Sequence, residues 1–420
     1  MAVGISSFHH YRHDLRRSTR YQPLIMGSTP TTPAVEPKIT SSVHNVGEEK
    51  PPFGSRFLTD EAEVWSQNAW DHVPPPDDQV ETIAASLSKQ RLAPVPEADK
   101  PKYNEKPSRH WDNFYKMNSS NFFRNRKWLH NEFPELVDAT QPEAGPVTIS
   151  EIGCGAGNSV FPLLSANKNP DLRLLAYDYS SHAVKLVQNN PLYLAPRVGT
   201  VHAAVWDVTS SDGLPLGMEP GSVDIVILVF VFSALHPDEW GRAIANIHRM
   251  LKPGGLVVMR DYGRHDLTQL RFKTGRLLQD NFYIRGDKTR VYFFELDELA
   301  LLFTGSRARA SQITDRTTET LEDDDSQPSE ASSPVPESSE PSQPLEEQSI
   351  GEGSSFTPSA ASTDTSTVIH PNLLTPLADC PPHPLFIMEQ LGVDRRLLVN
   401  RKRQLKMYRV WMQGKFRKIS

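Results

Sequence analysis

A short apolar run, Val147 to Ile152, leads into Gly153-Cys154-Gly155-Ala156-Gly157, and an apolar helical pattern begins at Val160. Strand, glycine-rich turn and helix, in that order, place a nucleotide-like ligand across the carboxyl end of the first strand of an open α/β sheet. Glycines allow the backbone to approach a ligand where a Cβ atom would collide. This turn therefore predicts a doubly wound α/β domain with a ligand site at its centre.

The spacing of these glycines indicates the class of nucleotide. The turn reads G-x-G-x-G, with Glu151 two residues before the first glycine, and Asn158 occupies the place of the last glycine of the dinucleotide motif G-x-G-x-x-G. Asp178 ends the next apolar run, where a carboxylate can accept hydrogen bonds from both ribose hydroxyls. This pattern is typical of methyltransferases that use S-adenosyl-L-methionine (SAM), and it argues against a nicotinamide cofactor.

Apolar runs and helical patterns alternate along the domain, which predicts a mostly parallel sheet with helices on both faces. We expect strands at 147–152, 172–177, 198–204, 225–232 and 256–260, and helices at 180–190, 236–251 and 296–303. Lys252-Pro253-Gly254-Gly255 is expected to end the helix before the fifth strand. The runs at 385–388 and 406–412 are expected to complete a Rossmann-like, seven-stranded class I methyltransferase sheet, whose last strand is antiparallel.

Composition divides the 420 residues into five segments. They are a disordered leader (1–50), an N-terminal helical and aromatic accessory segment with a linker (51–107), the first part of the catalytic domain (108–304), a disordered Ser/Pro-rich insert (305–384) and the last strands (385–420). The insert holds 14 acidic residues and three arginines, so the rest of the chain carries +5 although the whole carries −6. A basic folded part is compatible with an RNA partner.

Other features bear on location. Two cysteines, Cys154 and Cys380, exclude a disulfide framework and favour a reducing compartment. No apolar run approaches the roughly 18 residues of a membrane span, and we predict neither a membrane association nor a metal site. The first 26 residues are basic apart from Asp14, which fits a mitochondrial presequence, a disordered leader or a true start at Met26. We expect a cytoplasmic protein, with mitochondria as the alternative.

Strand ends supply the candidate cofactor contacts, because ligands of such sheets lie beyond the carboxyl ends of the strands. Gly153 would lie along the methionine tail, and Asp178 would bind the ribose. Asp207 would accept a hydrogen bond from the adenine amino group while Val208 packs against the ring; the alternative for Asp207 is a turn or helix-capping acid. Val229 would lie below the transferring methyl group.

Two further pairs have two interpretations each. Trp111 and Tyr115 are four residues apart, so they share a helix face; they either clamp adenine or the sulfonium or pack a helix against the sheet. Asp261 and Tyr262 follow the fifth strand; they either hold the acceptor base or form a capped turn.

Two basic stretches contain aromatic residues or lie near them, a mixture that suits RNA phosphates with unstacked bases, although charge runs are often merely solvated. The first comprises Arg271, Lys273, Arg276, Arg285, Lys288 and Arg290; the second comprises Arg395, Arg396, Arg401, Lys402, Arg403, Lys406 and Arg409.

Ordered blocks along the chain resemble the tRNA N3-methylcytidine methyltransferases. The blocks are Phe53 to Leu58, Asn68 to Asp71, Trp111 to Tyr115, Asn121 to Phe123, Arg126 to Leu129, Gly153 to Asn158, Asn190 to Tyr193, Phe232 to Pro237, Arg260 to Gly263, Asn281 to Tyr283, Thr289 to Phe294, Asp394 to Arg401 and Lys415 to Lys418. The N-terminal blocks resemble the branch that acts on threonine tRNAs, and the C-terminal blocks resemble fungal members. The acidic insert is longer than in minimal members.

The resemblance implies SAM-dependent methylation of N3 of cytidine 32 in the anticodon loop of threonine tRNAs, with serine tRNAs as a second candidate. It also implies that Trp111, Tyr115, Gly153, Asp178, Asp207, Val208 and Val229 contact SAM, and it leaves room for an aminoacyl-tRNA synthetase or another protein partner. Asp261 is a candidate to stabilise the cationic product. The alternatives are a small-molecule methyltransferase of the same fold, or a catalytically silent RNA-binding subunit.

Overall fold

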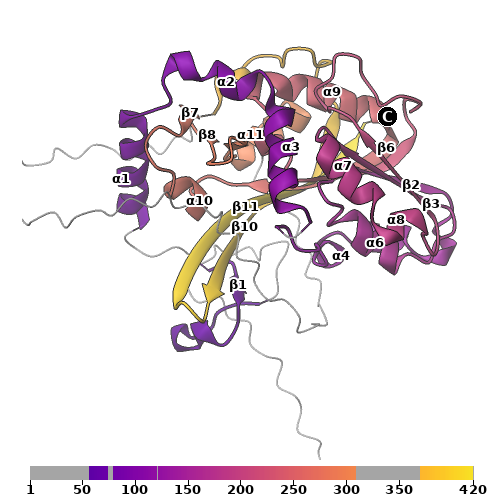
Figure 1. Cartoon of the computed structure of the whole chain (residues 1–420), viewed down its shortest axis with the longest axis horizontal. Coiled ribbons are helices and arrows are strands. Elements are labelled where there is room, and N and C mark those ends of the chain that lie inside the picture. Colours follow the sequence, from indigo (N-terminus) through magenta and orange to yellow (C-terminus); the bar gives the residue numbers. More distant parts are fainter. Residues whose placement is uncertain (1–55, 74–78, 121, 309–368, 420) are drawn as a thin grey trace, which may run out of the picture. The chain divides into compact units, whose positions relative to one another are not determined.

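A computed structural model describes residues 56–73, 79–120, 122–308 and 369–419. The expected leader (1–50) and most of the expected insert (309–368) lie outside the described residues. One sheet dominates the chain, in the order β4-β3-β2-β5-β6-β11-β10-β1 (Figure 1). Its strands are β1 (Ala69–Asp71), β2 (Val147–Ile152), β3 (Leu172–Asp178), β4 (Thr200–Val205), β5 (Val223–Val229), β6 (Leu251–Tyr262), β10 (Phe386–Asn400) and β11 (Leu405–Lys418).

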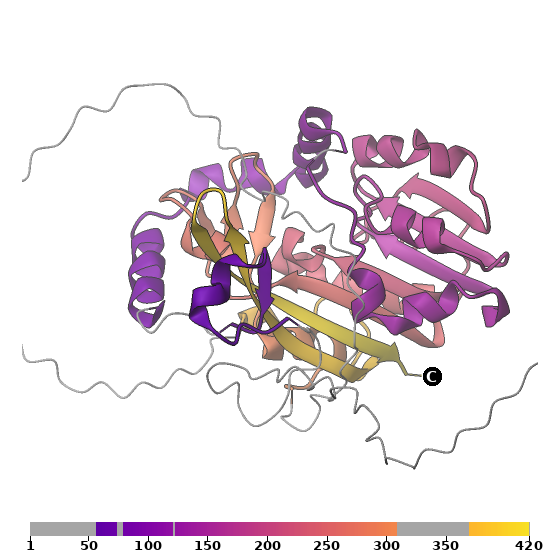
Figure 2. The ribbon, with the colours of Figure 1, turned by 90° about the horizontal axis from the view of Figure 1, so that it is seen from below.

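The direction of the strands confirms the expected doubly wound sheet. Strands β4, β3, β2, β5 and β6 run parallel, and β11 enters antiparallel between β6 and β10. Because the five parallel strands share one direction, their carboxyl ends meet at one edge of the sheet. An eighth strand, β1, which the sequence did not predict, pairs Trp70 with Leu397 on the outer side of β10. The β10–β11 hairpin extends past β6 and carries β1 beside it (Figure 2).

Helices cover both faces of this sheet, as the apolar pattern predicted. One face packs against α4 (Leu129–Glu132), α5 (Pro134–Ala139), α6 (Val160–Ala166), α7 (Ser181–Gln188) and α8 (Pro191–Leu194). The other face packs against α9 (Trp240–Met250) and α11 (Leu296–Thr304). Along β5 the side chains alternate between the two cores, with Val226 and Leu228 in one and Ile225 and Ile227 in the other.

Three details depart from the expected elements. The segment Lys252-Pro253-Gly254-Gly255 lies within β6 instead of a loop, with a shift of pairing against β5. The fourth strand ends at Val229, and a short 3-10 helix (Phe232–Ala234) follows. A second, three-stranded sheet forms where the sequence showed only a basic stretch; its strands are β7 (Leu277–Gln279), β8 (Phe282–Ile284) and β9 (Arg290–Tyr292).

The chain packs against the domain again from Ile369, earlier than the Leu385 boundary expected from composition. Ile369 and Leu373 are buried in the core that contains α9 and α11. The remaining helices are α1 (Gln79–Leu92), α2 (Pro101–Asn104), α3 (Pro107–Asn118) and α10 (Leu267–Leu270). None of the helices within the described ranges has the length and apolar character needed to cross a membrane.

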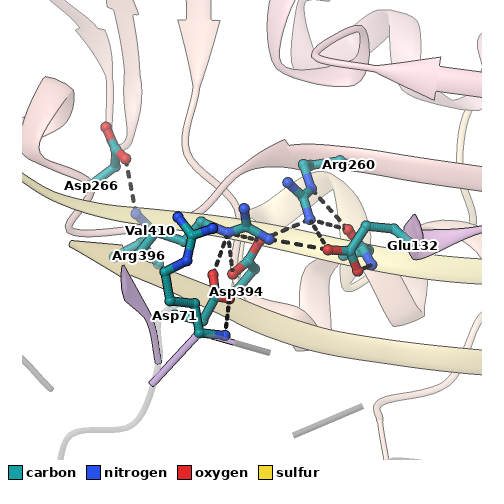
Figure 3. A network of polar contacts seen from close by, with 9 residues as sticks. Asp71, Glu132, Arg260, Asp266, Asp394, Arg396 and Val410 are labelled. Atoms are coloured by element: carbon teal, nitrogen blue, oxygen red, sulfur yellow. Dashed lines mark hydrogen bonds and ion pairs between the residues drawn. The ribbon is translucent and has the colours of Figure 1, made fainter. Parts of the chain in front are cut away.

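A buried ion-pair network joins the N-terminal segment to the sheet (Figure 3). The guanidinium of Arg260 lies 2.8 Å from Asp394, and that of Arg396 lies 3.1 Å from both Asp71 and Glu132. Burial alone would raise the pKa of Asp394, but Arg396 and Arg260 outweigh it, so the pKa is lowered. Arg396, which the sequence placed in an RNA-facing stretch, thus has a structural role.

Candidate cofactor and substrate site

A cavity opens at the shared carboxyl edge of the parallel strands, bordered by α3. Its wall contains all seven residues that the sequence singled out for the cofactor, namely Trp111, Tyr115, Gly153, Asp178, Asp207, Val208 and Val229. Tyr262 also lines the cavity, whereas Asp261 does not. Residues from several elements and loops therefore meet here because the strand order brings their ends together.

The glycine turn has the conformation that its sequence suggested. Gly153 and Gly155 have φ angles of +67° and +53°, which L-residues with side chains rarely adopt. A Cβ atom at Gly153 would lie 2.8 Å from the side chain of Val231, and one at Gly155 would overlap the hydroxyl of Tyr115. The turn therefore packs tightly against the side chains of Val231 and Tyr115, with no room for larger residues at these two positions, and the backbone of Gly153 forms part of the cavity wall.

Asp178 is held by the same turn. The amide of Gly155 donates to its Oδ2 at 2.9 Å, and the amide of Ser180 donates to its Oδ1 at 2.8 Å. Burial raises the pKa of Asp178 to about 6 in spite of these hydrogen bonds. Each carboxylate oxygen keeps a second lone pair, so the group can accept two hydroxyl donors from the cavity.

Asp207 forms the turn that was one of its two predicted roles, and it also lines the cavity. Its Oδ1 accepts hydrogen bonds from the amide and hydroxyl of Thr209 at 2.8 and 2.7 Å, which makes a turn. Its other oxygen is the one available to a ligand. Val208 beside it is buried, and its backbone carbonyl accepts a hydrogen bond from Asn246 at 2.8 Å.

The aromatic pair on α3 both packs the helix and walls the cavity. The rings of Trp111 and Tyr115 stack at 6.0 Å between centroids, as four-residue spacing on one helix predicts. Asp112 fixes the helix in place, because Ser180 Oγ and the amide of His182 donate to it at 2.7 and 3.1 Å. Tyr115 is buried against the glycine turn, while Trp111 is half-buried at the cavity wall.

The cavity wall also contains Tyr179 and Arg126, which the sequence analysis did not predict as site residues. The hydroxyl of Tyr179 is covered and has no hydrogen-bond partner among the described residues, and burial raises its pKa. Its position directly after Asp178 was the available signal. Arg126 lies near the turn, where it donates to Glu151 at 3.2 Å and to Ser159 at 3.0 Å. Burial raises the pKa of Glu151 to about 7, although Arg126 opposes the shift.

A third group forms an aromatic corner beyond the end of β5. Phe230 has a φ angle of +61°, a strained conformation for an aromatic residue, and its amide donates to the carbonyl of Arg260 at 2.8 Å. Its ring lies 4.6 Å from that of Tyr262, tilted by 37°. The guanidinium of Arg285 lies 5.4 Å from the Tyr262 ring. These three side chains all line the cavity.

Asp261 lies behind this corner. It is 1% exposed, and its two oxygens accept the amides of Ser233 and Tyr262 at 3.0 and 2.9 Å. Burial raises its pKa to about 6. The structure therefore does not support the direct contact with the acceptor base that the sequence suggested for Asp261; the carboxylate orients the backbone that carries Tyr262.

These residues fit an adenosine ligand with a sulfonium. The glycine turn offers backbone, Asp178 offers paired acceptors, and the covered hydroxyl of Tyr179 offers one more polar partner. Aromatic faces such as that of Trp111 attract cations within about 6 Å.

Comparisons with known proteins agree with this geometry. A family described as "Methyltransferase domain" matches residues 150–257. The chain is 42% identical to the tRNA(Thr) (cytosine(32)-N(3))-methyltransferase of Saccharomyces cerevisiae over 87% of its length, and it spans 45% of that protein. It is 39% identical to the tRNA N(3)-methylcytidine methyltransferase trm140 of Schizosaccharomyces pombe, covering 91% of this chain and 97% of that protein.

More distant matches extend the series. The tRNA N(3)-cytidine methyltransferase METTL2 of Danio rerio is 32% identical, with 94% of this chain and 98% of that protein covered. A solved SAM-dependent methyltransferase from Methanosarcina mazei is 15% identical with a TM-score of 0.37, covering 68% of this chain and 98% of that chain. The protein is thus a SAM-dependent methyltransferase that belongs to the tRNA N3-methylcytidine methyltransferase family.

Proposed function

We propose that this protein methylates N3 of cytidine 32 in the anticodon loop of threonine tRNAs, with serine tRNAs as a second substrate to be tested. The observation that carries the proposal is the 42% identity to a relative whose name specifies this tRNA, position and atom. The cavity supports it, since its two halves suit a nucleoside cofactor and a planar acceptor.

The cofactor half assigns one role to each residue. The backbone at Gly153 would run along the methionine tail, and Asp178 would accept hydrogen bonds from the ribose hydroxyls. Asp207 would accept the adenine amino proton, with Val208 against the ring. Trp111 and Tyr115 would cover the ligand from α3, and Val229 would lie below the methyl group. When bound, SAM supplies an electrophilic methyl group on a sulfonium.

The acceptor half is the corner of Phe230 and Tyr262. A cytosine must leave its stack to expose N3, and stacking between aromatic side chains is the usual way to hold such a base. Phe230 and Tyr262 would hold the ring in line with the methyl group. The N3 lone pair forms the new N–C bond as the S–C bond breaks, so S-adenosylhomocysteine leaves and the base becomes cationic. Because neutral N3 carries no proton, positioning replaces a general base.

The direct test is nucleoside analysis of tRNA after incubation with the protein and SAM. Unmodified threonine tRNA transcript should gain 3-methylcytidine, and Asp178→Asn should abolish the gain while leaving tRNA binding unchanged. Formation of another methylated nucleoside, or of none in any tRNA fraction, would refute the proposal. Methylation of a small molecule in place of tRNA would favour the first alternative.

We also propose that the protein acts in the cytoplasm and that an aminoacyl-tRNA synthetase or another protein assists it. The two cysteines, which favour a reducing compartment, motivate the first statement, and the family resemblance motivates the second. A fluorescent fusion tests the first, with mitochondrial signal as the contrary outcome. Methylation rates with and without added threonyl- or seryl-tRNA synthetase test the second, and an unchanged rate in both cases would exclude such assistance.

A further inference from the structure

A second groove, of about 670 Å³, opens beside the cavity between α2–α3 and the turn that joins β8 to β9. Helices α2 and α3 and the link between them contribute Lys102, Glu105, Lys106, Arg109, His110, Asn113, Lys116 and Met117, and the turn contributes Gly286, Asp287 and Lys288. We name these residues the α3 groove. Five of its side chains are cationic and two are acidic.

Most of these cations have no ion-pair partner in the part of the chain that the structure describes. Within the described residues, no ion pair is recorded for Lys106, Arg109, Lys116 or Lys288, and all four are exposed. The acid of the turn is engaged locally, because the amide and hydroxyl of Thr289 donate to Asp287. The groove therefore holds a surplus of positive charge that nothing in the described fold neutralises.

The pKa of His110 is lowered by burial and, in part, by this surplus of positive charge. Burial is the main cause of its lowered pKa, and the cations Lys288, Arg290 and Arg109 lower it further. Two arginines of the second basic stretch differ in this respect. Arg396 is paired with Asp394, and Arg409 is paired with Asp266 at 2.8 Å.

The α3 groove adjoins the cavity. Asp287 belongs to the walls of both. Helix α3 lies between the groove and the cavity and contributes side chains to both. Trp111 and Tyr115 line the cavity, whereas Arg109 and Lys116 line the groove. An extended polyanion that lies in the groove can therefore insert its neighbouring unit into the cavity.

We propose that the α3 groove binds the backbone phosphates of the tRNA on one side of the target nucleotide. The inference rests on the proposed function and adds the surface that brings the anticodon loop to the cavity. Lysine and arginine neutralise RNA phosphates and release counterions, so binding there depends on salt. Phosphate binding in the groove would attract the tRNA without regard to its sequence and would also place the target base at the cavity.

The test uses the full chain with Lys106→Ala, Arg109→Ala and Lys116→Ala combined. All three side chains are exposed on or at the start of α3, and Lys106 makes no side-chain cap, so the helix should persist. The matched control replaces three exposed cations near the opposite edge of the sheet by Ala, namely Lys168, Arg173 and Arg249. Each triple variant removes the same charge.

Binding of threonine tRNA transcript is measured without SAM, at several salt concentrations. The groove variant should bind about tenfold or more weakly at 0.15 M salt, and its slope of log K against log [salt] should fall by roughly 2 to 3, at 0.7–0.9 per phosphate contact. The control variant should keep the wild-type slope, and both should bind S-adenosylhomocysteine normally.

Equal loss in both variants, or an unchanged slope in the groove variant, would overturn the proposal. So would intact tRNA binding combined with lost binding of polyglutamate, which would assign the groove to an acidic peptide. Because binding is read separately from product, failure of the wild type to form 3-methylcytidine would refute the proposed function without touching this result.

Discussion

Replacement of Asp178 by asparagine tests the cofactor site most sharply, because the carboxylate is fixed by two backbone amides and buried. The side-chain amide of the variant cannot accept from both Gly155 and Ser180, since its nitrogen would face one of these donors. Charge-assisted hydrogen bonds contribute about 1.5–3 kcal/mol each. We expect a loss of about 3 kcal/mol, roughly a hundredfold in Kd, for S-adenosylhomocysteine measured by calorimetry.

The affinity for S-adenosylhomocysteine should also depend on pH, because the ionised form of Asp178 is the better hydrogen-bond acceptor. With a pKa of about 6, Asp178 is mostly ionised at pH 7 and about one-tenth ionised at pH 5. Wild-type affinity should therefore rise about tenfold from pH 5 to pH 7 and then level off. The Asp178→Asn variant should show no such rise.

The contribution of Asp178 to the free energy of unfolding should fall as pH rises, whereas the affinity for the ligand rises. The folded-state pKa of Asp178 lies above its ordinary value of 3.8, so the folded state binds the proton more tightly than the unfolded state. Its contribution to the free energy of unfolding is therefore lost as pH rises from about 4 to 6, by roughly 3 kcal/mol. Urea unfolding of wild type and Asp178→Asn across this range isolates the difference. Wild-type affinity that stays flat from pH 5 to 8, or near-normal binding by the variant, would refute the reasoning.

Three other substitutions probe separate parts of the structure. Gly155→Ala should abolish S-adenosylhomocysteine binding in calorimetry, because the new Cβ overlaps the Tyr115 hydroxyl at a positive φ; a normal Kd would contradict the close approach. Phe230→Ala should slow single-turnover methyl transfer by about fivefold or more, since base stacking contributes roughly 1–3 kcal/mol, and an unchanged rate would remove Phe230 from the acceptor site. Arg396→Met should lower the free energy of unfolding by about 3–5 kcal/mol, because Asp394 stays buried with less compensation; a loss below about 1 kcal/mol in urea titration would show that the network contributes little.

The predicted cofactor residues all line one cavity because a local pattern combined with one topological rule. Gly153, Asp178, Asp207 and Val229 each end or follow an apolar run, and parallel strands bring those ends to a single edge. No further information about distant contacts was needed for these four positions. The placement of Trp111 required more, because α3 is held at the cavity by long-range hydrogen bonds to the start of α7 and by aromatic packing.

The residues that sequence misjudged depend on contacts that no local pattern encodes. Arg396 and Lys288 look alike in a basic stretch, yet one is paired with buried acids and the other is exposed. Asp261 and Tyr262 are consecutive in β6, so their side chains point to opposite faces and only one of them can face the cavity; the alternation does not say which one, and the structure shows that it is Tyr262. The positive φ of Phe230 has no sequence signal, because neighbouring strands impose it.

The two halves of the cavity are proposed to bring a methyl donor to one cytidine of the anticodon loop. This proposal is tested by comparing methyl incorporation from labelled SAM into threonine tRNA transcripts with cytidine or uridine at position 32. We expect one methyl group per tRNA, recovered as 3-methylcytidine, with cytidine at this position and none with uridine. Equal incorporation into both transcripts would contradict the proposal.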